Sequence, residues 1–312
     1  MKKFFTAVAI VLLALSLFGG SANVSFINPL GPTIIPIAPI LSGALKGTVP
    51  IKISLWKSTD EAIALLSKGT ADFAVLPVTL GAIVYNKGID LKLLGVYEWK
   101  VFYLVASKEA SFTGWKDLGG KSVYTPEGRG QTVDVLMRYM MSKSGVTPDR
   151  DVKIFYAPPQ EIVSLFKSGK IQYAALPEPF VTMAISGGSG RIVLDFQKEW
   201  GREMNQPERI PIAGLFVKKS FFDENPSVVK EVEDLFSESI KWMNANPNKA
   251  IRLTIPYLKI PVPILEKSLK RMSFYYVPAS KCEKEVSAFL EKINELYPEG
   301  MPKIPDKGFY AN

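Results

Sequence analysis

The sequence repeats itself at an offset of 100 residues. Residues 64–77 read ALLSKGTADFAVLP, and residues 164–177 read SLFKSGKIQYAALP. Each copy has the pattern of the end of an amphipathic helix, a glycine that stops it, a short buried strand and a proline turn. The identical pairs are Leu65/Leu165, Gly69/Gly169, Ala74/Ala174, Leu76/Leu176 and Pro77/Pro177.

Four further matches extend this repeat in the same order along the chain. They pair residues 24–31 with 122–130, 51–53 with 152–154, 98–99 with 199–200, and 102–112 with 214–222. The shared order favours a structural duplication. The alternative is that α/β units resemble one another in any protein.

Strands alternate with helices in each copy, which predicts an α/β fold of two doubly wound lobes with mainly parallel sheets. The chain is expected to cross between the lobes before a strand at 102–107 and to return before a strand at 214–218, giving a two-strand hinge. We therefore expect residues 23–101 plus 213–312 to form lobe I and residues 102–212 to form lobe II. The first helix is expected to begin around Pro36.

The N-terminus has the pattern of a secretory signal peptide. Lys2 and Lys3 precede an apolar run at 4–18, and small residues follow up to Ala22. The run is shorter than the about 20 residues that a membrane span needs, which disfavours an uncleaved anchor. Cys282 is the single cysteine and lies far from this segment, so we expect no lipid anchor and no internal disulfide. The sequence predicts a signal peptide at 1–22 and an exported protein, periplasmic or extracellular.

The composition disfavours nucleic-acid binding and most catalysis. Without Lys2 and Lys3, 36 basic residues remain against 30 acidic ones, a net charge of +6 that is spread among acids and apolar residues. The chain has no histidine, the commonest general base and metal ligand, and Cys282 therefore has no histidine partner. We expect no catalytic residues, no metal and no cofactor.

Two glycine-containing loops follow predicted strands, at 28–33 and 125–132. Ligands of doubly wound folds bind at such strand ends, and the N–H groups of the next helix suit a carboxylate, sulfonate, phosphate or polar ring edge. The alternative for each loop is a tight strand-to-helix turn. Thr79 and Glu178 follow the duplicated proline turns; Thr79 is a candidate donor and Glu178 a candidate acceptor. For Glu178 the alternative is a helix-start carboxylate facing the dipole. The aromatic residues expected near the cleft edges are Trp56, Trp99, Tyr103 and Tyr124.

The segments LLSKGTADFAVLP, GWKDLGGKSVYTPEG, PPQEIVSLFKSGKIQYAALPEPFVTMA and IPIAGLFVKKSFFDENPSVV span most of residues 24–250. In them the chain resembles type II periplasmic-binding proteins of the nitrate, sulfonate, taurine and thiamine-precursor binding group. The resemblance implies a hinged cleft that closes on its ligand and delivers it to an ABC permease. By position it implies ligand-lining residues Gly31, Thr33, Thr79, Gly130, Gln131, Thr132 and Glu178, to which we add Trp56, Trp99 and Gly128 as candidates.

The chain also departs from that group, because its first loop lacks the Asp-Trp pattern of thiamine-precursor binders. We expect a monomeric, extracytoplasmic substrate-binding subunit of an ABC importer. Its ligand is expected to be a small polar or anionic organic solute: a sulfonate, a nitrate-like anion or a vitamin-precursor heterocycle. One alternative is an enzyme on the same two-lobed fold, similar to menaquinone-precursor dehydratases and acting in the cytoplasm. Another is a sensory domain, which would need a DNA-binding or membrane-spanning segment.

Overall fold

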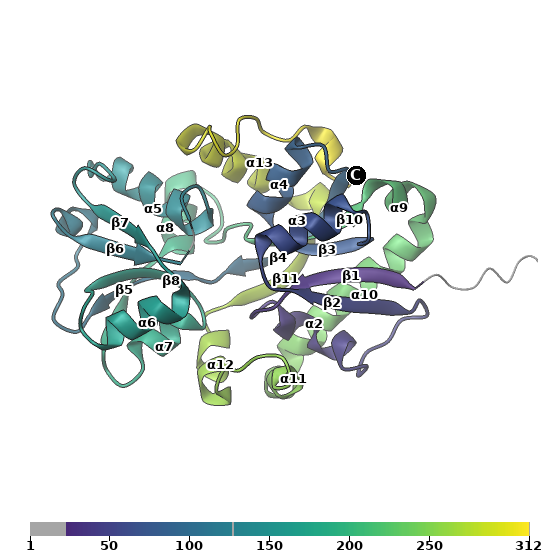
Figure 1. Ribbon diagram of the computed structural model, residues 1–312, viewed down its shortest axis with the longest axis horizontal. Coiled ribbons are helices and arrows are strands. Elements are labelled where there is room, and N and C mark those ends of the chain that lie inside the picture. Colours follow the sequence, from purple (N-terminus) through teal and green to yellow (C-terminus); the bar gives the residue numbers. More distant parts are fainter. Residues whose placement is uncertain (1–22, 127, 312) are drawn as a thin grey trace, which may run out of the picture.

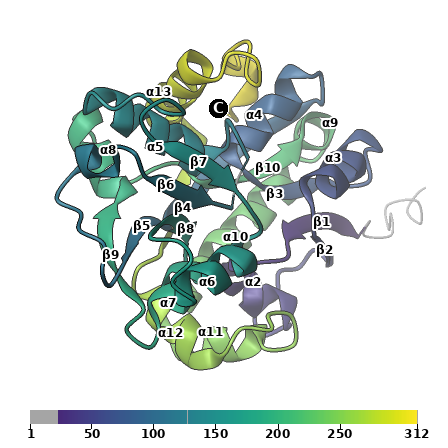
Figure 2. The ribbon, with the colours of Figure 1, turned by 60° about the vertical axis from the view of Figure 1, so that its left-hand side comes forward.

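The computed structural model describes residues 23–126 and 128–311, so the predicted signal peptide at 1–22 lies outside the described residues. Figure 1 shows two lobes side by side, each a β-sheet with helices packed around it, and Figure 2 shows the same arrangement from another side. The mixed α/β fold class is therefore confirmed.

The lobe I sheet has the strand order β11-β4-β10-β3-β1-β2, and the lobe II sheet has the order β7-β6-β8-β5-β9. The lobe I strands are β1 (Val24–Pro29), β2 (Ile51–Trp56), β3 (Phe73–Pro77), β4 (Leu91–Lys100), β10 (Ala213–Lys218) and β11 (Ser273–Pro278). The lobe II strands are β5 (Phe102–Ser107), β6 (Ser122–Thr125), β7 (Lys153–Tyr156), β8 (Tyr173–Pro177) and β9 (Gly190–Asp195). The chain thus leaves the lobe I sheet after β4 and returns to it with β10. We propose that the lobe boundaries lie in these two crossings, as expected from the sequence.

The helices follow the strands in the alternation that the sequence predicts. They are α2 (Ile34–Leu41), α3 (Thr59–Ser67), α4 (Val78–Asn86), α5 (Thr132–Lys143), α6 (Pro159–Lys167), α7 (Phe180–Ile185), α8 (Phe196–Met204), α9 (Lys219–Glu224), α10 (Pro226–Ala245), α11 (Pro247–Thr254), α12 (Val262–Leu269) and α13 (Ala279–Leu296), with short 3-10 helices η1 (Trp115–Leu118) and η2 (Lys307–Phe309).

The two sheets confirm the duplication. Read from their β2 and β7 edges, the orders β2-β1-β3-β10-β4 and β7-β6-β8-β5-β9 match strand for strand. One of the sequence matches is wrong: Trp99 lies in β4, whereas Trp200 lies in α8, and the strand equivalent to β4 is β9. A two-residue match carries too little pattern to fix a register.

The duplicated glycines stop their helices as the repeat predicts. Gly69 and Gly169 have φ values of 65° and 73°, a left-handed conformation that glycine adopts without steric cost. The N–H of Gly169 donates to the carbonyl of Phe166, and the next N–H along donates to the carbonyl of Leu165. The equivalent bonds follow α3, so both helices end in the same capping motif.

The expectation of mainly parallel sheets is wrong. β1 runs parallel to β2 and β3, and β6 runs parallel to β7 and β8, but β10 and β5 are antiparallel to both of their neighbours. The reason is that each of these two strands enters its sheet from the other lobe and therefore runs in reverse. Each sheet is mixed.

The first helix also starts earlier than expected, at Ile34 rather than Pro36. The N–H groups of Ile34 and Ile35 donate to the carbonyls of Gly31 and Pro32, which closes two turns ahead of Pro36. Pro36 then falls in the first turn, where a missing N–H costs little, and Pro39 lies inside the helix.

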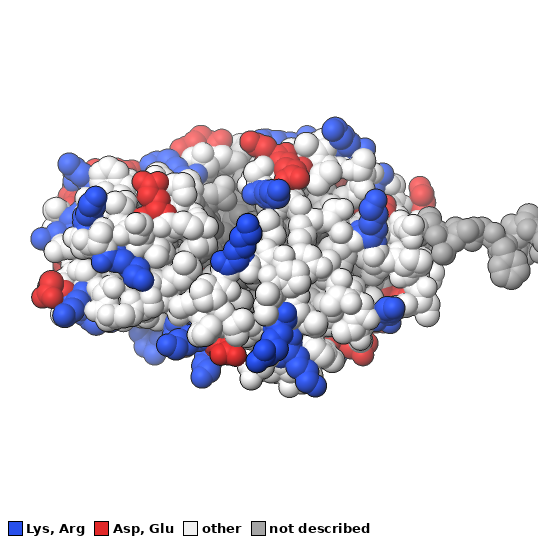
Figure 3. All heavy atoms as spheres, turned by 60° about the horizontal axis from the view of Figure 1, so that its bottom comes forward, with Lys and Arg blue, Asp and Glu red and all other residues white. Residues whose placement is uncertain are grey.

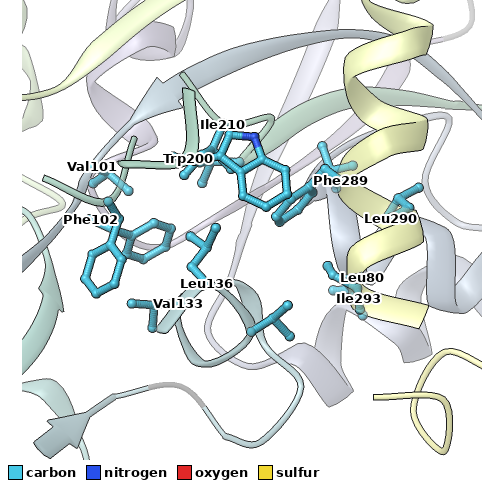
Figure 4. Close-up of a cluster of buried hydrophobic side chains, with 14 of the residues drawn as sticks. Leu80, Val101, Phe102, Val133, Leu136, Trp200, Ile210, Phe289, Leu290 and Ile293 are labelled. Carbon is cyan, nitrogen blue, oxygen red and sulfur yellow. The ribbon is translucent and has the colours of Figure 1, made fainter. Parts of the chain in front are cut away.

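A buried apolar cluster joins the two lobes. Figure 4 shows side chains of α13 packed toward Trp200 of α8 and toward the crossing segments. The rings of Phe289 and Trp200 lie 5.6 Å apart and nearly perpendicular. The labelled members are Leu80, Val101, Phe102, Val133, Leu136, Trp200, Ile210, Phe289, Leu290 and Ile293. Burial of each large apolar side chain contributes about 1.5–3 kcal/mol, so the cluster is a substantial tie between the lobes.

The face in Figure 3 shows Lys and Arg spread over both lobes rather than gathered in one patch. This distribution fits solvated helix surfaces better than a nucleic-acid footprint. Within residues 23–126 and 128–311, no helix combines the length and apolar character needed to cross a membrane.

Cys282 provides a test of the packing of α13. Its side chain is 1% exposed, and burial raises the pKa of the thiol to about 11. Because the thiolate is the reactive form, we expect no reaction with a disulfide reagent at about pH 8 in the native protein and full reaction in denaturant. The absorbance of the thiolate that the reagent releases measures the reaction in the native and in the denatured protein. Rapid labelling of native protein would contradict the packing of α13 described above.

Candidate functional site

A cavity of about 180 Å³ lies where the two lobes meet. Its walls come from β1, β2, β3 and β4 of lobe I, from both crossing segments, and from α5, β8 and α7 of lobe II. The lining residues are Pro29, Pro32, Thr33, Trp56, Val75, Leu76, Pro77, Glu98, Val101, Phe102, Thr132, Pro177, Glu178, Phe180, Ile212 and Ala213. Most of this surface is apolar, with a few polar groups among it.

The duplicated proline turns stand on opposite walls of the cavity. Pro77 ends β3 and Pro177 ends β8, and both line the cavity. The N–H of Val78 donates to the carbonyl of Ile212 (3.0 Å), and the N–H of Glu178 donates to the carbonyl of Val101 (2.9 Å). Each turn is therefore hydrogen-bonded to one of the two crossing segments.

The crossing segments also bond to each other and to a buried glutamine. The N–H groups of Ile210 and Ile212 donate to the carbonyls of Trp99 and Glu98, both at 3.0 Å. The amide of Gln197, fully buried at the start of α8, accepts from Val101 and Phe102 and donates to the carbonyl of Phe102. Sequence reasoning missed Gln197, because its only signal was a polar residue in the first turn of a helix.

Four buried polar atoms at or near strand ends have no hydrogen-bond partner within the described part of the chain, and of their residues only Trp56 lines the cavity. They are Asn28 Oδ1, Trp56 Nε1, Thr79 Oγ1 and Thr125 Oγ1. Asn28, Trp56 and Thr125 lie at the carboxyl ends of β1, β2 and β6, and Thr79 lies two residues beyond Pro77. An unsatisfied buried polar group costs about 1–3 kcal/mol. Their common position at strand ends is where ligands of doubly wound folds bind.

The charged groups of the wall are carboxylates. Glu98 and Glu178 are 5% and 1% exposed. Glu178 accepts hydrogen bonds from the N–H (3.0 Å) and the hydroxyl (2.8 Å) of Thr182, and it forms an ion pair with Arg271. This arrangement agrees with the helix-start alternative for Glu178 and leaves the residue on the cavity wall.

Arg271 connects the lobes on this side of the cavity. It precedes β11 of lobe I, and its guanidinium bonds to Glu178 and to the hydroxyl of Thr182 in lobe II. Its carbonyl accepts from the hydroxyl of Tyr103 at 2.6 Å. Burial, followed by the nearby Asp195 carboxylate, raises the pKa of Tyr103 well above its ordinary value, so this hydroxyl stays a donor at neutral pH.

Four of the ten candidates from the sequence line the cavity: Thr33, Trp56, Thr132 and Glu178. Gly31 and Thr79 are not among the lining residues: Gly31 lies in the first loop between Pro29 and Pro32, which are, and Thr79 is buried in α4 two residues beyond Pro77. Trp99 lies elsewhere, fully buried, stacked on Tyr275 at 5.6 Å with the guanidinium of Arg209 4.4 Å above its ring. Glu98 was missed, although an acidic residue directly after the uncharged run at 93–97 was a signal that could have identified it.

The loop before α5 holds Gly128, Gly130 and Gln131, which do not line the cavity. The N–H of Gly130 donates to the carboxylate of Asp134 (2.8 Å), and the N–H of Gln131 donates to the carbonyl of Gly128 (3.1 Å). These two backbone N–H groups are therefore already bonded within the protein, and the loop has two fewer donors for an anionic ligand group than the sequence predicted. Asp134 in turn accepts from Arg138 and Tyr156, which fixes the loop.

A cavity walled by two lobes, with two crossing strands between them, defines the type II periplasmic-binding-protein fold. The profile of the NMT1-like family matches residues 51–255, and the chain belongs to this family. Within residues 23–126 and 128–311, no group of three or more acidic or cysteine side chains is placed to hold a metal ion.

Solved structures with the same fold cover nearly the whole chain. An ABC transporter protein from Parabacteroides distasonis is 26% identical, with a TM-score of 0.79 over 93% of this chain and 99% of that one. The periplasmic aliphatic sulphonate binding protein of Escherichia coli is 18% identical, with a TM-score of 0.76 over 93% of this chain and 92% of that one. The nitrate-binding protein of Synechocystis PCC 6803 is 13% identical, with a TM-score of 0.69 over 94% and 92%.

Among curated sequences, a protein of Brucella abortus named as a binding protein is 26% identical over 162 residues, 52% of this chain. The match spans 48% of that relative, so this chain matches about half the length of the curated relative.

The two glycines of the loop before α5 give a matched pair of variants. Gly130 has a φ of 81°, and an added Cβ would lie 1.8 Å from the ring of Tyr297; nothing lies within 4 Å of an added Cβ at Gly128. We expect Gly130→Ala to destabilise the protein by at least about 1–2 kcal/mol from the backbone alone, and Gly128→Ala to change stability by less than about 0.5 kcal/mol. Urea unfolding measures both. Equal stabilities would show that Tyr297 does not pack on this loop.

Thr79 tests whether the unpartnered polar atoms serve a ligand. Thr79→Val removes a buried hydroxyl that has no partner, so the melting temperature should stay the same or rise. If this hydroxyl serves a bound solute, the affinity for that solute should fall about 2- to 12-fold, the equivalent of one hydrogen bond. The matched control is Thr182→Val, whose hydroxyl bonds to Glu178 and Arg271 and whose loss should lower the melting temperature. A large loss of stability in Thr79→Val would contradict the assignment.

Proposed function

We propose that the protein is the extracytoplasmic substrate-binding subunit of an ABC importer and captures a small organic solute between its lobes. Membership of the NMT1-like family supports this function, as does a fold shared with proteins named as sulphonate-binding, nitrate-binding and ABC transporter components.

The observation that carries the proposal is the cavity itself. It draws walls from both lobes, and Trp56, whose buried indole N–H has no partner in the described residues, is part of its lining. A ligand shifts an open–closed equilibrium only through its different affinity for the two states. A solute that touches Trp56 in lobe I and Phe180 in lobe II has more contacts when the lobes are together, so binding would favour closure.

We further infer that the solute is released unchanged to a permease in the cytoplasmic membrane. The relatives and neighbours named above are binding proteins and transporter components rather than enzymes, which supports release without reaction. We also propose that the N-terminal segment directs export. We propose a monomeric state, because one two-lobed chain holds the whole cavity.

The test is native mass spectrometry of protein purified from the periplasmic or culture fluid of its own host. We expect the mass of a chain that begins near Asn23 plus the mass of one bound small molecule. The small molecule should have the same mass after its release from the protein. Rebinding should raise the melting temperature, because a ligand that binds only the folded state stabilises it by mass action. At a ligand concentration 100 times the dissociation constant, the free energy of unfolding increases by about 2.7 kcal/mol. A released molecule that differs from the one supplied would mean turnover and would favour the enzyme alternative.

Thr132→Phe places a ring in the cavity and should abolish retention of the solute. The matched control is Thr70→Phe on the exposed turn after α3, at the opposite ends of the strands, which should retain it. Retention by both variants would place the binding site outside this cavity.

A further inference from the structure

We propose that a second cavity between the lobes binds an oxyanion of the phosphate or sulfate type. This basic cavity has a volume of about 320 Å³ and lies between α7 of lobe II and α12 of lobe I. Its polar wall comes from Thr182, Ser186 and Gly187 on one side and from Lys267, Lys270 and Arg271 on the other. It shares no lining residue with the first cavity, so the inference goes beyond the proposed function and does not depend on it.

The ion pair between Arg271 and Glu178 stands between the two cavities. Glu178 lines the first cavity and not the basic one, whereas Arg271 lines the basic cavity and not the first. The side chain of Glu178 is fully buried, and that of Arg271 is 30% exposed. The guanidinium therefore faces the basic cavity on the side away from its carboxylate partner.

The charged residues that line the basic cavity are all cations. Lys267 and Lys270 lie three residues apart at the end of α12, a spacing that puts like charges beside each other. Both side chains are exposed, and neither forms an ion pair with a described residue. Their ammonium groups are available to a ligand.

Two further donors reach the same cavity. Arg271 uses Nε for Glu178 and Nη2 for the hydroxyl of Thr182, which leaves Nη1. Lys167, in the last turn of α6, donates to the hydroxyl of Ser186 on the cavity wall at 3.4 Å and brings a cation from lobe II. Both lobes thus supply positive charge to one cavity.

The alternative is that these cations only offset the negative ends of helix dipoles, because α6, α7 and α12 all end near the basic cavity. A helix C-terminus carries at most about half a negative charge, so three of them amount to about −1.5. With Glu178 the negative total is about −2.5, against four cations at 167, 267, 270 and 271. A positive excess remains for a ligand to neutralise.

A tetrahedral oxyanion matches this arrangement. Several oxygens on one centre can accept from two ammonium groups and a guanidinium at once, and such charge-assisted bonds are the strong ones. Free phosphate and the phosphate headgroup of a lipid present the same chemistry. Because the walls belong to both lobes, the bound anion would bridge them beside the Arg271 ion pair.

The test titrates inorganic phosphate into the full-length mature protein at about pH 7.5, with potassium chloride at the same ionic strength as the reference, because salt screens exposed charges in any case. Calorimetry should give a dissociation constant of about 1 mM or below, and phosphate should raise the melting temperature relative to chloride. Equal melting temperatures in the two salts, with no heat of binding, would overturn a site for free phosphate.

A matched pair of double variants locates the site. Lys267→Gln/Lys270→Gln should weaken phosphate binding at least about tenfold. Lys281→Gln/Lys284→Gln removes the same charge at the same spacing from two exposed positions of α13 and should leave the affinity within about twofold. Melts in chloride show that both variants are folded. An equal loss in both would mean that phosphate responds to net charge alone and would overturn the site.

Vesicles distinguish the two sources of the oxyanion. Cosedimentation with phosphatidylglycerol vesicles but not with phosphatidylcholine vesicles, lost in Lys267→Gln/Lys270→Gln and kept in the control, would support the site and assign it to a lipid headgroup. Phosphate binding without cosedimentation would support it and assign it to a free anion. If neither phosphate nor vesicles bind, the inference is wrong, while retention of a solute in native mass spectrometry still decides the proposed function separately.

Discussion

The structure depends on the reciprocal insertion of one strand from each crossing into the opposite sheet. β10 returns from lobe II and pairs with β3, and β5 leaves lobe I and pairs with β8. At the ends of these pairs, Val78 donates to Ile212 and Glu178 donates to Val101. The backbone bonds of the hinge are therefore also the bonds that hold the walls of the cavity. Any motion about the hinge has to keep these backbone hydrogen bonds or exchange them for others. The cavity and the hinge are therefore a single structural unit.

The ties between the lobes are of two kinds. On one side α13 packs against α5 and α8, through Phe289 and Trp200. On the other side Arg271 reaches Glu178 and Thr182 across the gap. The apolar contact supplies non-directional stabilisation, whereas the ion pair exists only in one geometry. Both ties are made in the same structure, one on each side of the cavity.

The family and the fold leave the ligand open. Proteins named for sulphonate and nitrate share this architecture at 18% and 13% identity, levels at which the site is free to change. In this chain two N–H groups at the start of α2 bond to the preceding loop, and the wall carries Glu98 and Glu178, the latter paired with Arg271. The chemistry of the wall therefore decides the ligand class.

The sequence by itself determined the duplication, the alternation of strands and helices, and the glycine stops at Gly69 and Gly169, because these follow from local periodicity and backbone preference. It also placed Thr33, Trp56, Thr132 and Glu178, since residues after a strand fall at the carboxyl edge of a sheet. It could not show that β5 and β10 run antiparallel, because strand direction depends on which lobe the chain comes from. Nor could it separate Trp56, which lines the cavity, from Trp99, which packs on Tyr275. Both lie near the carboxyl end of a strand, and only the tertiary structure decides which side chain faces the other lobe and which faces the core.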